Sequence, residues 1–112
     1  MPEIQVQQEI PESDTTRHLY ILRLDFSRLT CGRKEFYDAI QAENIGVNVH
    51  YIPVYWFPYY QHLGYQRGIC PNAEEIYEGI MSIPLYPAMV DQDVEDVITA
   101  VKKLVDYYRI NN

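Results

Sequence analysis

The chain has 112 residues, of which 47% are hydrophobic and 22% charged, the composition of one small globular domain. Its net charge of −7 and pI near 4.8 exclude a nucleic-acid partner, because such partners require a basic face. No apolar run reaches the roughly 18 residues of a membrane span. The opening MPEIQVQQEI lacks the basic start and apolar centre of a signal peptide. We therefore expect a cytoplasmic protein with no membrane partner.

The side chains that most often bind metals are scattered along the chain. There are two cysteines and three histidines: Cys31, Cys70, His18, His50 and His62. No pair has the close spacing of a metal site, and an intracellular chain keeps its thiols reduced. The sequence therefore predicts neither a metal centre nor a disulfide.

The first half of the chain predicts one strand and one helix. Residues 1–16 carry four acidic and no basic residues and are interpreted as an acidic linker or frayed terminus. A short edge strand around Ile4 and Val6 is the weaker alternative. HLYILRLDF, residues 18–26, alternates apolar side chains and predicts a strand. RKEFYDAIQAEN, residues 33–44, has a helical apolar stripe and predicts a helix.

The middle of the chain predicts a second strand followed by a long loop. NIGVNVHYI, residues 44–52, alternates apolar and polar side chains up to Pro53. Residues 53–71 contain prolines and glycines at intervals, so they predict a loop with one helical turn near residues 59–63.

The last third predicts two helices around an extended piece. PNAEEIYEGIMSI predicts a helix over about 73–82, and the prolines of IPLYP keep residues 83–87 extended. We expect Asp91 to cap a long final helix. Its apolar side chains recur at steps of three and four: Val94, Val97, Ile98, Val101, Leu104, Val105 and Tyr108. This order predicts an α/β (α+β) sandwich, a small, mostly antiparallel sheet of about three strands with helices packed on it.

Few residues carry recognisable chemistry. The serines lack a nucleophile-elbow context, and there is no phosphate-binding glycine loop. The three lysines, Lys34, Lys102 and Lys103, fall on the polar faces of predicted helices. A Schiff-base lysine must be desolvated, so we interpret all three as surface residues.

The stretch VNVHYIPVYWFPYY, residues 47–60, is the strongest candidate for a binding site. It holds six aromatic residues, including the chain's only tryptophan. An aromatic loop on a rigid sheet forms a good wall for a ligand, and His50 is placed to contact that ligand. Two alternatives remain open: His50 is a surface histidine with a local hydrogen bond, and the rings form a satellite core. Arg23 is similarly open between a rim ion pair and an anion contact.

An ordered series of motifs resembles a known family. The series is HLYILRLD, R-x-E-F-x-x-A-I-x-A-E-N-I-G-V, VHYIPVYWFPYY, LGY, CPNAEEIYEGIMSIPLYPAM and D-V-E-D-V-I. Together these motifs resemble the C-terminal domain of the nucleotide-sugar aminotransferases of the DegT/DnrJ/StrS class, which use pyridoxal phosphate. The resemblance covers roughly residues 17–109 and places the chain in the fold-type I aspartate-aminotransferase superfamily, with the small-domain fold of those enzymes.

The resemblance implies an activity for the full-length enzyme. Such enzymes are homodimers that move an amino group from glutamate to a keto group on a nucleotide-linked sugar, in polysaccharide, flagellar or antibiotic pathways. A large N-terminal domain binds pyridoxal phosphate and carries the Schiff-base lysine, and the small C-terminal domain covers the site. Carried over to this chain, the resemblance implies that His50, Tyr51 and Tyr55 contact the substrate. Many relatives have a histidine at the position of Tyr55.

The chain also departs from the family. The lysine segment, the phosphate-binding residues and the carboxylate partner of the pyridine ring have no counterpart here, and the cofactor chemistry needs them. We therefore expect residues 17–112 to be the small domain, residues 1–16 the connection to the large domain, and this chain alone to bind no cofactor and to be inactive. The alternative is a stand-alone, non-catalytic module that binds a small molecule or a protein.

Overall fold

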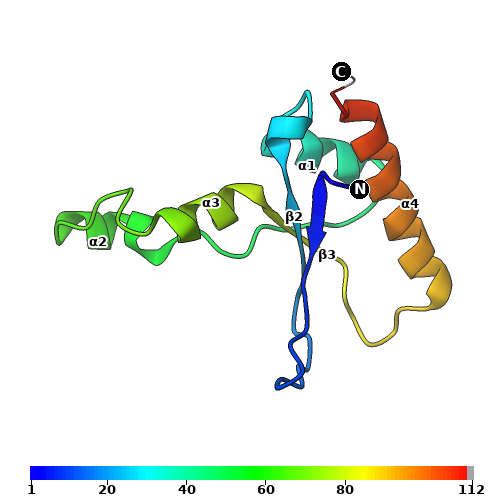
Figure 1. Cartoon of the computed structure of the whole chain (residues 1–112), viewed down its shortest axis with the longest axis horizontal. Coiled ribbons are helices and arrows are strands. Elements are labelled where there is room, and N and C mark those ends of the chain that lie inside the picture. Colours follow the sequence, from blue (N-terminus) through cyan, green and yellow to red (C-terminus); the bar gives the residue numbers. More distant parts are fainter. Residues whose placement is uncertain (111–112) are drawn as a thin grey trace.

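The computed structural model describes residues 1–110 (Figure 1). In chain order its elements are β1 (Ile4–Val6), β2 (Tyr20–Leu24), the 3-10 helix η1 (Phe26–Arg28), α1 (Arg33–Ala42), the 3-10 helix η2 (Val54–Trp56), α2 (Pro58–His62), α3 (Pro71–Gly79), β3 (Ile80–Ile83) and α4 (Asp91–Tyr108). No helix within residues 1–110 combines the length and apolarity needed to cross a bilayer.

The three strands form one antiparallel sheet in the order β1-β2-β3. Ile4 lies opposite Leu24 across the first pair, and Tyr20 lies opposite Ile83 across the second. One sheet face, which includes Leu22, packs against α1 and α4. This confirms the predicted class, a three-stranded antiparallel sheet with helices packed on it.

The core lies between this sheet face and the two long helices. Its most buried large side chains are Phe36 and Ile40 of α1, Met81 of β3 and Val105 of α4. Burying one such side chain stabilises a fold by roughly 1.5–3 kcal/mol, so these contacts account for the position of both helices. The Phe36 ring also meets the ring of Tyr108, with centroids 6.3 Å apart.

Residues 54–79, here called the arm, project sideways from this body (Figure 1). The arm contains η2, α2 and α3. The radius of gyration is 15.9 Å, whereas a compact domain of this length has about 13 Å. The extra size reflects the arm, most of whose side chains are exposed, and the connection between β1 and β2, which also projects from the body (Figure 1). The helix α2 confirms the helical turn predicted near residues 59–63.

The prediction of a second strand over residues 44–52 is wrong. In this segment only Asn48 is bridged to the sheet, opposite Ser82. A strand needs a ladder partner, and β3 has only four residues to offer. The chain then leaves the sheet edge at Pro53 and enters the arm.

The helix predicted over 73–82 begins and ends earlier, at Pro71 and Gly79. Ile80 and Met81 are buried, but in strand β3 rather than in the predicted helix, and Ile76 is exposed. The change from helix to strand falls at Gly79. A Cβ atom at this position would lie 3.0 Å from the carbonyl oxygen of Leu24. Only a residue without a side chain lets the helix end pack this closely on β2.

The first strand and the last helix differ from the main expectation, although the weaker alternative of a short edge strand around Ile4 and Val6 is confirmed. Residues 4–6 pair with β2, and the buried Glu3 accepts a hydrogen bond of 2.8 Å from Arg109 Nε, so part of the 1–16 segment is ordered. At α4, Asp91 is the first helical residue rather than the cap. The N-cap is Val90, and its N–H donates to Asp93 Oδ2 over 2.9 Å.

Candidate functional site

The first part of the candidate site is the sheet-edge cluster, defined as His50, Tyr51 and Ser82. The backbones of Asn48 and Ser82 exchange hydrogen bonds of 3.0 and 2.7 Å, which fixes the irregular segment against β3. Two residues beyond Asn48, His50 lies on the same side and reaches diagonally to Ser82. Its Nδ1 atom is 3.0 Å from Ser82 Oγ.

Tyr51 completes this cluster. Its ring centroid lies 4.6 Å from that of His50, and the peptide bond between the two residues is cis. Tyr51 is 68% exposed, whereas His50 is half-buried. The cluster therefore presents one anchored imidazole and one free phenol ring to its surroundings.

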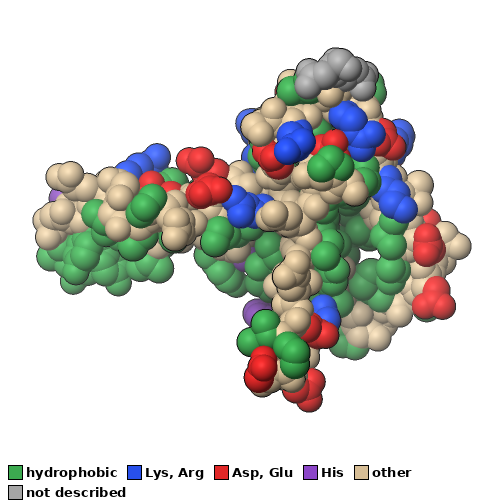
Figure 2. All heavy atoms as spheres, viewed as in Figure 1, with side chains coloured by type: hydrophobic (Ala, Val, Ile, Leu, Met, Phe, Trp, Pro, Cys, Tyr) green, Lys and Arg blue, Asp and Glu red, His purple; other side chains and the backbone are tan. Residues whose placement is uncertain are grey.

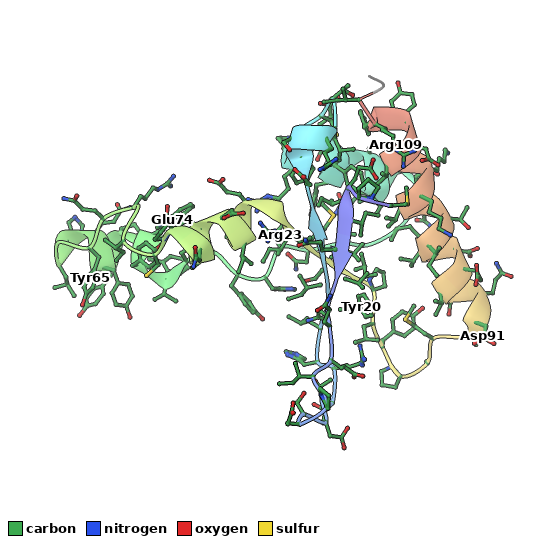
Figure 3. All side chains as sticks on the ribbon, viewed as in Figure 1. Tyr20, Arg23, Tyr65, Glu74, Asp91 and Arg109 are labelled. Carbon is green, nitrogen blue, oxygen red and sulfur yellow. The ribbon has the colours of Figure 1, made fainter. Side chains whose placement is uncertain are left out.

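The second part is the arm cluster around Glu74 of α3, which Figure 3 labels on the arm. Tyr55 OH donates to Glu74 Oε1 over 2.6 Å, and Gly68 N–H donates to the same oxygen over 2.5 Å. Desolvation and then the Glu74 carboxylate raise the pKa of Tyr55 to about 12. The Tyr55 hydroxyl and the Gly68 N–H lower the pKa of Glu74. Tyr55 thus stays a neutral phenol whose proton is held by Glu74.

Trp56 forms the packed centre of the arm. The Arg67 guanidinium lies 3.9 Å from the Trp56 ring centroid, within cation–π range. On another side the ring meets that of Tyr77 edge-on at 5.4 Å. The satellite-core interpretation therefore describes Trp56 and its neighbours correctly.

Many other apolar side chains of the arm remain open to solvent. Figure 2 shows hydrophobic atoms gathered along one side of the arm. The exposed large side chains here are Val54, Phe57, Tyr59, Leu63, Tyr65, Ile69 and Ile76. Contiguous exposed apolar surface of this kind marks a surface that meets a partner or ligand.

The predicted site residues are only partly brought together. His50 and Tyr51 are in contact, whereas the Tyr55 hydroxyl bonds to Glu74 and Cys70 on the arm. Arg23, at the root of the arm in Figure 3, forms an ion pair with Glu75 over 2.5 Å, which favours the rim ion pair. Sequence reasoning missed Ser82 and Glu74. Both residues lie in the motif CPNAEEIYEGIMSIPLYPAM, which supported the resemblance without assigning a role to either of them.

The residues present do not fit pyridoxal phosphate. Lys34 has an 89% exposed side chain paired with Asp38, whose hydrogen bond raises the pKa of this lysine. A Schiff-base lysine needs the opposite, a desolvated amine with a lowered pKa. Lys103 is paired with Glu43, and Lys102 is exposed. Within residues 1–110 no group of three or more His, Cys, Asp or Glu could hold a metal ion.

Fold and site together define a small α+β domain with an aromatic arm and three exposed lysines. A sequence model of the DegT/DnrJ/EryC1/StrS aminotransferase family matches residues 1–102. The chain belongs to this aminotransferase family, whose full-length enzymes use pyridoxal phosphate.

Three similar proteins place the chain more closely. It is 47% identical over 90 residues to the spore coat polysaccharide biosynthesis protein SpsC of Bacillus subtilis, covering 79% of this chain and 23% of that protein. It is 45% identical over 93 residues to an uncharacterised protein of Methanocaldococcus jannaschii, covering 82% and 24%. The crystal structure of S. venezuelae DesV in complex with a ketimine intermediate has a TM-score of 0.83 at 26% identity, covering 98% of this chain and 28% of that one.

The chain spans about a quarter of the length of these relatives. The likeness to DesV extends over nearly all of this chain, the arm included. It therefore supports the predicted fold type as well as the family, and SpsC connects the chain to proteins of sugar biosynthesis.

Proposed function

We propose that the chain is the C-terminal, substrate-covering domain of a sugar aminotransferase that uses pyridoxal phosphate. In this proposal residues 17–112 are the small domain and residues 1–16 connect it to a large N-terminal domain. The observation that carries the proposal is the coverage: the family match spans residues 1–102, yet the chain equals only about a quarter of each relative. The exposed, ion-paired lysines agree with a cofactor site on another part of the enzyme.

The full-length enzyme transfers an amino group from glutamate to a keto sugar carried on a nucleotide, as a cytoplasmic homodimer. His50, Tyr51 and Tyr55 contact this substrate. Two features support these roles: His50 and Tyr51 are adjacent at the sheet edge, and Tyr51 is exposed. The role of Tyr55 has less support than the other two, because its hydroxyl is already bonded to Glu74 on the arm. This chain alone lacks the large domain and is inactive.

The test is a chimera in which this chain replaces the matched 90 residues of SpsC. We expect the chimera to fold, to bind pyridoxal phosphate and to release 2-oxoglutarate from glutamate when a nucleotide-linked keto sugar is present. SpsC truncated before the matched region is the control and should be inactive. His50→Ala and Tyr51→Ala in the chimera should raise KM for the sugar nucleotide by about tenfold, the loss of roughly one hydrogen bond or ring contact.

Two outcomes would contradict the proposal. Transamination by the 112-residue chain alone would show that the large domain is not needed. A folded, cofactor-loaded but inactive chimera, combined with saturable ligand or protein binding by the chain itself, would favour the stand-alone module instead.

A further inference from the structure

Ser82 holds an unusually fixed position beside His50. It lies in β3 and is only 6% exposed. Its backbone N–H and C=O are both bonded to Asn48 on one side, and on the other side it pairs with Ile21 of β2. The backbone of Ser82 is thus held from both sides, and its hydroxyl oxygen lies 3.0 Å from His50 Nδ1.

The direction of this hydrogen bond follows from the number of donors. A serine hydroxyl has one donor hydrogen, and a buried donor without an acceptor destabilises the fold. Within residues 1–110, His50 Nδ1 is the one hydrogen-bond partner of Ser82 Oγ. The hydroxyl therefore donates to Nδ1, which must then be unprotonated. A neutral imidazole with an unprotonated Nδ1 carries its proton on Nε2.

We propose that Ser82 is a positioning residue that holds His50 in the Nε2–H tautomer, so that His50 offers a hydrogen-bond donor to the ligand. The proposal rests on the proposed function, in which His50 contacts the sugar nucleotide. Nε2 has no hydrogen-bond partner within residues 1–110. The atom that His50 recognises must accordingly be an acceptor, an oxygen or an unprotonated ring nitrogen of the sugar nucleotide. An ammonium or other donor group would place a second donor against Nε2–H, with no acceptor for either, and would be rejected.

The tautomer is measured directly by nitrogen-15 NMR of the 112-residue chain, at a pH of about 8.5, where histidines of ordinary pKa are neutral. We expect one tautomer for His50, with the proton on Nε2. Ser82→Ala removes the donor and should raise the Nδ1–H fraction several-fold, whereas Ser82→Thr keeps a hydroxyl and should preserve the wild-type tautomer. Ser82→Cys, whose thiol is a weak donor, replaces Ser82→Ala if that variant does not fold.

His18 and His62 are internal references, since neither is bonded to Ser82. Their signals should be the same in every variant. A wild-type His50 protonated on Nδ1 would overturn the proposal, and so would a tautomer unchanged in the folded variant that lacks the hydroxyl. The measurement needs no substrate and no large domain. Its failure is therefore distinct from failure of the SpsC chimera, which tests the activity.

Discussion

Single hydrogen bonds decide the chemistry of this site. Tyr55 shows this most clearly, because its hydroxyl donates to Glu74, and desolvation together with that carboxylate raises the pKa of Tyr55 from 10 to about 12. The phenol stays protonated at neutral pH and holds the start of the arm to α3. The contribution to stability is complete below about pH 10 and is lost as the pH rises through about 12, since the folded state disfavours the phenolate.

Glu74→Gln should lower the pKa of Tyr55 toward 10, because the substitution removes the charge that disfavours a phenolate. The measurement is carbon-13 NMR of labelled tyrosine during an alkaline titration, with Tyr55→Phe to assign the signal. Glu75→Gln is the matched control: Glu75 is the neighbouring acid, paired with Arg23 instead, and its substitution should leave Tyr55 unchanged. A Tyr55 pKa that stays near 12 in Glu74→Gln would show that desolvation acts alone.

The residues of the site could be predicted from the sequence only where composition marks them. The aromatic run 47–60 indicated His50 and its neighbours without any coordinates. Ser82 carried no such mark, because its role depends on the backbone bridge to Asn48, 34 positions away in the chain. Long-range pairings of this kind leave no periodic pattern in the sequence.

At the scale of elements, periodicity predicted α1 and α4 well because both lie on one core. It failed over 44–52 and at the C-terminal end of the helix predicted over 73–82, where the chain forms β3 instead. An alternating pattern shows that a segment suits a strand, but only a partner makes one, and the segment 44–52 has only the bridge at Asn48. Apolar residues at the end of α3 fit a helix or a strand equally well. These residues form strand β3 because they pair with β2 along its open edge.

The two halves of α4 are buried to different extents. Leu104 is 7% exposed, whereas Val94 and Ile98, expected in the same buried stripe, are 43% and 38% exposed. The first half of the helix borders an apolar cavity of about 450 Å³, which the sheet lines from the other side. The stripe is thus continuous in sequence but only partly covered in the structure.

This difference predicts unequal effects of truncation along one helix. Leu104→Ala should lower the free energy of unfolding by about 2–5 kcal/mol, and Ile98→Ala by about 1 kcal/mol or less. Urea unfolding followed by circular dichroism measures both, and the slope m should be unchanged. Equal losses would mean that Ile98 is covered in solution, either by rearrangement of the chain or by a second copy.

At the scale of the whole molecule, the arm separates a stable body from an exposed surface. The body has its own sheet, two long helices and a core, and Glu3 and Arg109 tie its two ends together. The arm adds the packed rings around Trp56 but leaves several large apolar side chains uncovered. Exposed apolar surface of this kind suits contact with a partner, which in the proposed function is the large domain.

Without that partner, the arm should make the 112-residue chain self-associate, because exposed apolar surface is buried on association. Tyr59→Ser combined with Leu63→Ser removes two side chains that are 68% and 60% exposed and should weaken association at least several-fold in sedimentation velocity. Tyr107→Ser is the matched control: Tyr107 is 77% exposed but lies on α4, outside the arm, so its loss should change association little.

Hydrogen exchange supplies an independent readout, since uncovered backbone in residues 53–70 should exchange quickly at low protein concentration. A chain that is monomeric at high concentration, with slow and uniform protection across 53–70, would mean that the arm is a stable structure in its own right and needs no covering partner.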